Sequence, residues 1–389
     1  MTTPRCHCRL ALLALLCALP LGLGPVALAS PTGDDVRRVV DDAARAATQV
    51  ADAVEVWLAE QVRLATSTLA PETGVFVLRS VAVPETESTS LAWLSLEDAG
   101  ALPERLVLLV HGLDEPGDIW DDLAPVLVAD GHHVARFEYP NDQDPALSAD
   151  SLHEALADLR ARGVVSVSLV CHSMGGLVAR DVLTREGFYG GDGAGHDDLP
   201  AVAHFITVGT PNHGSPFASL QPIAEAREQV SRWLDDPANT ARVSAFQHDG
   251  TGEAAVALAE GSDYLEDLNG RGLPRDVEMT VIIGRVTPPQ AAATIRVVTR
   301  SALASRLLPS GFLRVVEKEA DAAVTLVGDG VVPVDSARLE GVSDTIVLQA
   351  DHRAMLRLMP IHREAYSLAG VEFDQPPAIP IIVDRLGTP

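Results

Sequence analysis

Cysteine is scarce in this sequence, and its scarcity excludes two kinds of structural support. Only 4 of the 389 residues are cysteines, and Cys6, Cys8 and Cys17 all lie near the N-terminus. Cys171 is therefore the single thiol of the remaining chain and has no partner for an internal disulfide. A zinc site built on several cysteines is excluded as well, and no His-Glu-x-x-His motif takes its place. The fold must depend on the packing of its core.

Basic residues are also few, and long apolar runs are absent after the N-terminal segment. The 29 lysines and arginines stand against 54 acidic residues, which gives a formal net charge of −25. This balance argues against nucleic acid as a partner and disfavours general attraction to anionic membranes. Its main consequence is solubility. After residue 29 no apolar run is long enough to span a bilayer, and the chain contains no internal repeat.

The N-terminal residues have the pattern of a secretory signal peptide. Arg5 and Arg9 precede an apolar segment, Leu10–Leu28, and small residues then provide a cleavage site. We expect cleavage after Ala29, in a protein exported to the periplasm or out of the cell. The mature chain would then carry 27 basic and 54 acidic residues, a net charge of −27. An uncleaved membrane anchor is the alternative.

Residues 34–70 predict a helical segment in front of the main domain, which we assign to residues 71–389. Apolar residues recur from Val36 to Leu64 at close to heptad spacing, and acidic residues stand at the start of the pattern. We expect this segment to pack on the main domain. The alternative is an arm that binds a protein partner.

From residue 105 onward, predicted strands alternate with predicted helices, which indicates a mostly parallel central sheet flanked by helices. We expect strands at 75–83, 91–96, 105–110, 133–139, 164–170, 202–208, 277–284, 324–327 and 345–349. Helices are expected at 119–129, at 147–161 and once more after residue 353. Two insertions, 215–275 and 287–316, interrupt the alternation as helical cap segments. Sites in such sheets collect at the carboxyl ends of the strands.

The insertion 287–316 differs in charge from the rest of the chain. It holds many apolar residues and no acidic one, together with four arginines, Arg296, Arg300, Arg306 and Arg314. We expect a lid or a surface that meets lipid or an anionic product. The alternative is a helix packed on the body with its arginines outward.

The stretch VVSVSLVCHSMGGLVAR, residues 164–180, places Ser173 where a strand gives way to a helix. Such a turn lifts the serine hydroxyl above the end of the sheet, and the free N–H groups of the following helix face any negative charge that forms there. Small residues must flank the turn. Gly175 fits, whereas Cys171 replaces the first glycine of the G-x-S-x-G pattern. The alternative is a serine that only caps the helix.

A serine nucleophile needs a base, and the base needs a group that orients it. Asp329 lies in a Gly-Asp-Gly loop that suits a carboxylate held at a sharp bend. His352 follows the last predicted strand, where a loop can bring an imidazole over Ser173. We therefore expect a triad of Ser173, Asp329 and His352. His213 is the alternative base and Asp335 the alternative acid.

The remaining polar residues near these strand ends receive supporting roles. Developing charge on the substrate oxygen needs aligned donors, and we expect the N–H groups of Leu113 and Met174 to form this oxyanion hole. His111 is expected to be structural, through a buried hydrogen bond. His172 adjoins Ser173 but should point away from it, which argues against a role as base. Asp351 is expected to support its neighbour His352.

Four blocks of the sequence resemble the α/β-hydrolase superfamily, and specifically its bacterial lipase and PGAP-type esterase branch. They are LVLLVHGL (106–113), LVCHSMGGLVAR (169–180), FITVGTPNHGSP (205–216) and GDGVVP with Asp351-His352 (328–333, 351–352). The resemblance implies the α/β-hydrolase fold and ester hydrolysis through an acyl-enzyme, with the triad and oxyanion hole given above. It also implies that the insertion 215–275 caps the acyl pocket. The segments 34–70 and 287–316 lie outside it.

These observations predict an exported serine hydrolase that cleaves carboxylic esters, with lipid-like or long-acyl substrates favoured by the apolar insertions. An acyltransferase using the same triad and a non-catalytic interaction protein of the same fold are the alternatives. We expect no cofactor. Some lipases of the branch hold calcium near the acid loop, and Asp321, Asp329 and Asp335 leave calcium open here without a defined ligand pattern.

Overall fold

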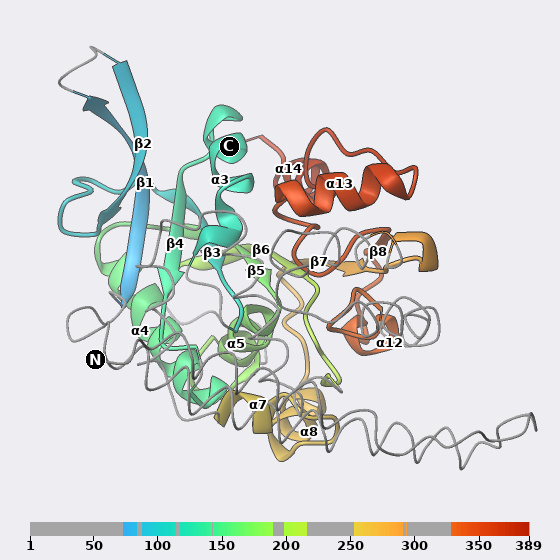
Figure 1. Cartoon of the computed structure of the whole chain (residues 1–389). Helices are drawn as coiled ribbons and strands as arrows, with labels where there is room; N and C mark the ends of the chain where they lie inside the picture. The colour runs from blue at the N-terminus through green and yellow to red at the C-terminus, as the bar shows by residue number, and fades with distance from the viewer. Residues whose placement is uncertain are drawn as a thin grey trace, which may run out of the picture.

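The computed structural model describes residues 73–83, 88–113, 117–141, 143–189, 198–215, 253–290, 293 and 328–388. Its centre is an eight-stranded sheet in the order β2-β1-β4-β3-β5-β6-β7-β8 (Figure 1). The strands are β1 (Gly74–Val83), β2 (Ser88–Ser95), β3 (Arg105–Val110), β4 (Val134–Glu138), β5 (Ser166–His172), β6 (Ala201–Val208), β7 (Glu278–Gly284) and β8 (Thr345–Leu348). β3 to β8 pair in parallel, whereas β1 is antiparallel to both β2 and β4. The predicted, mostly parallel sheet is confirmed.

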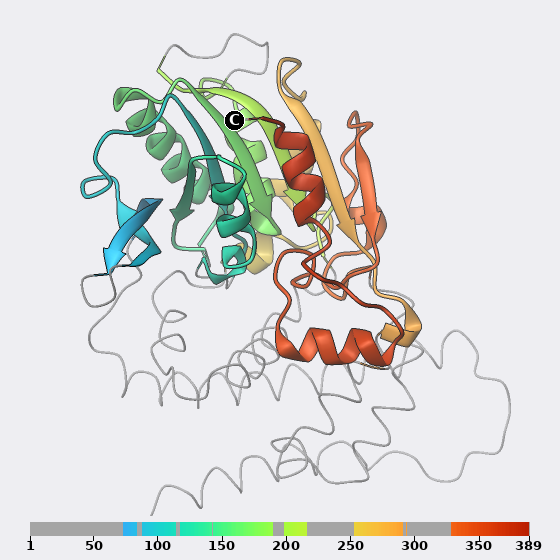
Figure 2. The ribbon, with the colours of Figure 1, turned by 90° about the horizontal axis from the view of Figure 1, so that it is seen from above.

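Helices cover both faces of the sheet (Figure 2). One face packs against α4 (Pro145–Ala161) and α5 (Met174–Thr184), and the other against α3 (Leu123–Ala129) and α14 (Ile379–Leu386). Successive residues of a strand point to opposite faces. In β5, Leu169 and Cys171 therefore enter the first core and Val170 the second, and all three are fully buried. This two-sided burial explains the continuous apolar run of the sequence.

Several predicted boundaries differ from the structure, and three of the differences have a clear physical reason. β5 reaches His172 rather than ending at residue 170, because Cys171 and His172 continue the ladder with β6. The predicted helix 119–129 is divided into η1 (Asp118–Trp120) and α3, and Asp122 before α3 accepts the N–H of Leu358 at 2.9 Å. The single closing helix is two helices, α13 (Pro360–Leu368) and α14, because Gly370 follows α13 with a left-handed φ of 73°.

Several predicted segments lie wholly or largely outside the described residues. These are the signal peptide 1–29, the segment 34–70, the strand 324–327, and most of the insertions 215–275 and 287–316. The described part of the first insertion contains α7 (Glu253–Ala257) and α8 (Asp263–Gly270), so it is helical as predicted. A short helix, α12 (Val334–Ala337), follows the Gly-Asp-Gly loop. None of the described helices has both the length and the apolar character of a membrane span.

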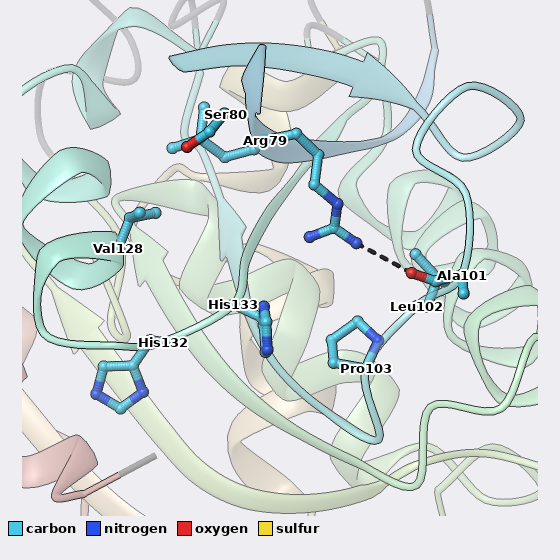
Figure 3. Close-up of a pocket in the computed structure, with 9 residues that line it drawn as sticks. Arg79, Ser80, Ala101, Leu102, Pro103, Val128, His132 and His133 are labelled. Carbon is cyan, nitrogen blue, oxygen red and sulfur yellow. Dashed lines mark hydrogen bonds between the residues drawn. The ribbon is translucent and has the colours of Figure 1, made fainter. Parts of the chain in front are cut away.

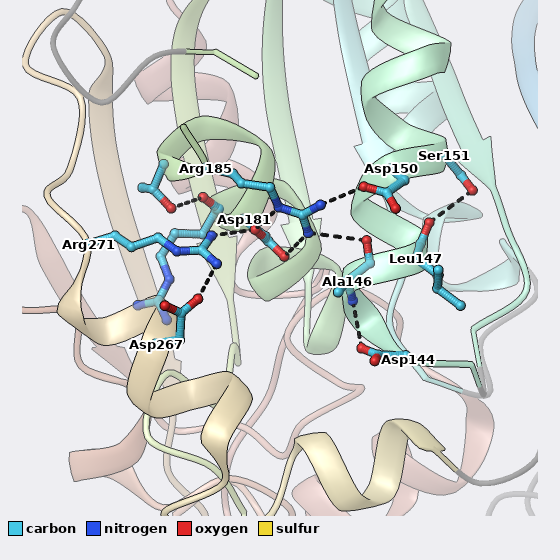
Figure 4. Close-up of polar contacts among 11 residues, drawn as sticks. Asp144, Ala146, Leu147, Asp150, Ser151, Asp181, Arg185, Asp267 and Arg271 are labelled. Atoms are coloured by element: carbon cyan, nitrogen blue, oxygen red, sulfur yellow. Dashed lines mark hydrogen bonds and ion pairs between the residues drawn. The ribbon is translucent and has the colours of Figure 1, made fainter. Parts of the chain in front are cut away.

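A buried ion network joins α8 to α5, the helix that follows Ser173 (Figure 4). Asp181 of α5 is fully buried, and its carboxylate accepts hydrogen bonds from Arg185 and Arg271. Beside it, Arg180 donates to the side chain of Asn269 at 2.8 Å, and burial lowers the pKa of Arg180 to about 10. The base of the first insertion is thereby tied to the helix that carries the serine turn.

Loss of the Asp181 charge should destabilise the fold strongly. Asp181→Asn leaves two arginines without their buried counter-charge, which typically costs about 3–5 kcal/mol. The matched control is Asp158→Asn, since Asp158 pairs with Arg162 on the exposed side of α4 and should change stability by less than about 1 kcal/mol. Urea unfolding at pH 7 measures both. Equal effects of the two substitutions would contradict this account of the network.

Candidate active site

Ser173 has a strained backbone. It lies between β5 and α5 with φ 52° and ψ −129°, and it is the one non-glycine residue with positive φ in the described chain. Such a conformation costs on the order of 1–3 kcal/mol and persists only when its surroundings enforce it. Here the Ser173 N–H donates to Val208 of β6 at 2.9 Å, and its carbonyl accepts the hydroxyl of Thr210 at 2.9 Å. The neighbouring strand end therefore holds this strand-to-helix turn in place.

The two small positions around the turn have different functions. Gly175 is required by close packing, because a Cβ there would lie 2.4 Å from the carbonyl oxygens of Val110 and His111 at the end of β3. Cys171 points into the core between the sheet and the helices α4 and α5, away from the turn. A small apolar side chain is accommodated there, which explains why the sequence can depart from glycine at this position.

Asp329 and His352 form a buried pair. The imidazole Nδ1 of His352 lies 2.7 Å from Oδ2 of Asp329, and the two residues are only 7% and 1% exposed. The N–H of His352 also donates to the carbonyl of Asp329 at 2.9 Å. The other carboxylate oxygen accepts the N–H groups of Val331 and Val332 at 2.9 and 2.7 Å. Because the carboxylate accepts, Nδ1 carries the proton, and Nε2 is the nitrogen that can act as a base.

Three glycines at strand ends leave room for the three predicted triad residues. A Cβ on Gly112, which follows β3, would lie 2.6 Å from Cβ of Ser173. A Cβ on Gly209, after β6, would lie 2.9 Å from Nδ1 of His352, and one on Gly284, the last residue of β7, would lie 2.6 Å from Cβ of Asp329. The three predicted residues therefore meet the same carboxyl edge of the sheet, as the alternation of strands and helices predicts.

The residues on either side of His352 are held by separate polar contacts. Asp351 accepts the hydroxyl of Tyr366 at 2.6 Å and the N–H of Ala354 at 3.0 Å. Arg353 donates to the carboxylate of Asp118 at 2.8 Å. Sequence reasoning missed Asp118, because its partner is 235 residues away and the two share no local motif.

The predicted oxyanion donors follow two neighbouring strands, β5 and β3. Met174 is the first residue of α5, so its N–H has no acceptor within the helix. Leu113 follows Gly112, where an added Cβ would lie 2.6 Å from Cβ of Ser173. The buried ring of His111 donates from Nδ1 to the carbonyl of Gly112 at 2.9 Å and stacks on Tyr139. The predicted structural role of His111 is confirmed, and it holds the backbone that carries Leu113.

The alternative base, His213, and the alternative acid, Asp335, contact other parts of the protein. His213 donates its N–H to Ser336 and has its ring near Asn269. The side chain of Asp335 is fully exposed and faces Arg338. Calcium stays an open prediction, since Asp321 lies outside the described residues. Within the described ranges, no group of three or more His, Cys, Asp or Glu side chains is arranged to hold a metal ion.

A hollow of about 490 Å³ lies at the other end of the sheet (Figure 3). Its lining includes Leu102 and Pro103, which precede β3, and His132 and His133, which precede β4. These residues stand at the amino ends of the parallel strands, whereas Ser173 stands at a carboxyl end. The hollow is therefore separate from the candidate active site.

The fold and the site together define a hydrolase-like α/β protein with a serine on a strained strand-to-helix turn. Residues 107–360, more than half of the chain, match the family described as "Alpha/beta hydrolase family". The chain belongs to this family, as its sequence blocks predict.

Solved structures similar to the chain include two bacterial lipases. The mature form of lipase BlEst2 from Bacillus licheniformis is 20% identical, with 65% of this chain and 86% of that chain covered and a TM-score of 0.40. The lipase of Staphylococcus hyicus is 14% identical, with 69% and 93% covered and a TM-score of 0.40. No curated protein matches the sequence. The family assignment rests on the sequence match and on the observed sheet.

The thiol of Cys171 should be unreactive in the folded protein. It is fully buried, and burial raises its pKa well above the ordinary value, so little thiolate exists at neutral pH. A bulky aromatic disulfide reagent should modify Cys171 only after unfolding in guanidinium. Rapid modification of the native protein would show that the turn at Ser173 is more open than the structure has it.

Proposed function

We propose that this protein is a serine hydrolase that cleaves carboxylic esters through an acyl-enzyme intermediate. The observation that carries the proposal is the buried pair of His352 and Asp329 at the same sheet edge as the strained turn of Ser173. A positive φ at a serine and a histidine fixed in one tautomer are costly features without a structural need. Both are what a serine nucleophile and its base require.

In the proposed reaction these groups act in turn. Ser173 Oγ attacks the ester carbonyl while Nε2 of His352 takes the hydroxyl proton, and Asp329 stabilises the imidazolium through Nδ1. The N–H groups of Met174 and Leu113 donate to the oxyanion. His352 then gives its proton to the leaving alcohol, which leaves Ser173 acylated. A water molecule that loses a proton to His352 attacks the acyl group, and collapse returns the proton to Ser173 and releases the acid.

The proposal extends to substrate and place of action. Lipid-like esters are supported by the apolar, arginine-rich composition of residues 287–316, which suits contact with a lipid surface or an anionic acyl product. Export is supported by the signal-peptide pattern of residues 1–29. Both supports come from the sequence, since these segments lie outside the described residues.

A fluorophosphonate probe tests the nucleophile directly. The probe should label the wild-type protein at Ser173, and Ser173→Ala should lose both the label and nearly all ester hydrolysis. Ser168→Ala is the matched control, because Ser168 of the same strand contacts His204 at 3.1 Å but has no positive φ. The Ser168→Ala variant should keep both the fluorophosphonate label and ester hydrolysis. A folded wild-type protein that takes no label, or a label that survives in Ser173→Ala, would refute the proposal.

Gly209→Ala tests the space that the site needs. The new Cβ would lie 2.9 Å from Nδ1 of His352 and would displace the ring, so kcat should fall by about 10-fold or more. Gly187→Ala is the control. Gly187 has a left-handed φ of +82°, similar to the +64° of Gly209, but a Cβ on Gly187 would meet nothing within 4 Å. Both substitutions strain the backbone, and only the first should reduce activity. Equal kcat values in an ester hydrolysis assay would contradict the proposed position of His352.

A further inference from the structure

His172 is a buried polar residue to which the mechanism above gives no part. It is the last residue of β5 and directly precedes Ser173, and it is completely buried. Its Nε2 lies 3.0 Å from the backbone carbonyl of His352, which is 180 residues away in the sequence. The two imidazole rings are also in contact, with centroids 4.6 Å apart and planes inclined by 48°. The contact joins the strand of the nucleophile to the loop of the base.

The hydrogen bond has a defined direction. A carbonyl oxygen only accepts, so Nε2 of His172 carries the proton and donates it. The N–H of His352 donates to the carbonyl of Asp329, so the backbone of His352 is held on one side by the acid and on the other by His172. Nδ1 of His352 is held by Asp329 as well. Together these contacts fix the direction in which Nε2 of His352 points.

The contact has a distinct place among the supports of His352. Asp351 binds Tyr366 of α13, and Arg353 binds Asp118 of η1, so both fix the loop to helices outside the sheet. β6 and β7 lie between β5 and β8, the strand that leads to His352. The loop that carries His352 crosses these strand ends, and there its backbone carbonyl accepts the hydrogen bond from His172. The contact therefore relates the loop to the strand that ends at Ser173.

We propose that His172 is a positioning residue for His352: its N–H, donated to the carbonyl of His352, sets the distance between the base and Ser173. The inference rests on the proposed function, since it assigns His352 as the base. Loss of the donor would remove this hydrogen bond to the carbonyl of His352, and the loop would shift. A misplacement of about 1 Å can reduce a rate by about 100-fold. Substrate binding would be little affected, because the side chain of His172 is completely buried.

Three substitutions separate the donor from the ring. His172→Gln places an amide N–H near the position of Nε2, His172→Asn carries the same amide one methylene short of it, and His172→Phe keeps a ring without a donor. Asn and Phe should lower kcat by about 10- to 100-fold with KM within about 2-fold, and Gln should stay within a few fold of wild type. His153→Phe is the control, because His153 stacks on Phe188 away from the sheet edge, and its kcat should be unchanged.

Circular dichroism and the thermal midpoint establish which variants are folded, and the comparison of Gln with Asn does not depend on the Phe variant. Wild-type kcat in the Asn and Phe variants would overturn the positioning role. So would a Gln variant as impaired as the Asn variant, because the donor would then have no part. Fluorophosphonate labelling of the wild type distinguishes the two levels. A wild-type protein that takes no label contradicts the proposed function. A labelled wild type whose kcat equals that of His172→Asn contradicts only the role of His172.

Discussion

The positive φ of Ser173 is the constraint on which the candidate site depends. The turn is stable only because β6 holds it, with Val208 accepting the N–H of Ser173 and Thr210 donating to its carbonyl. That support requires β5 and β6 to pair up to their last residues, which they do as far as His172 and Val208. The same extension of β5 brings His172 to the carbonyl of His352. The pairing of β5 with β6 thus maintains the strained backbone of Ser173.

Buried polar contacts complete the site at a distance from the reacting atoms. Asp118 lies after β3 and binds Arg353, the neighbour of His352, while Asp181 lies in α5 and binds Arg271 at the end of α8. Each contact joins segments that are far apart in the sequence. Because a buried charge without its partner is costly, these pairs restrict how the loops can move.

Much of this arrangement could be predicted from the sequence, because the relevant signals are local. Apolar runs bounded by polar turns gave the strands, and the order of Ser173, Asp329 and His352 at strand ends placed them at one edge. Contacts between distant segments could not be predicted. Nothing in the sequence near His172 indicates that its ring meets His352, because that contact depends on the register of β5 and on the path of a loop after β8. The boundary of β5 was wrong for the same reason, since pairing with β6 decides it.

The central claim is that Ser173 forms a covalent acyl intermediate with its substrate. The most direct measurement is mass spectrometry of the protein quenched in acid during turnover of p-nitrophenyl acetate, followed by peptide mapping. The account predicts an acetyl group on the peptide that contains Ser173, which disappears when the substrate is exhausted. Steady turnover without any acylated peptide, or acetylation at another residue that forms and decays at the catalytic rate, would contradict it.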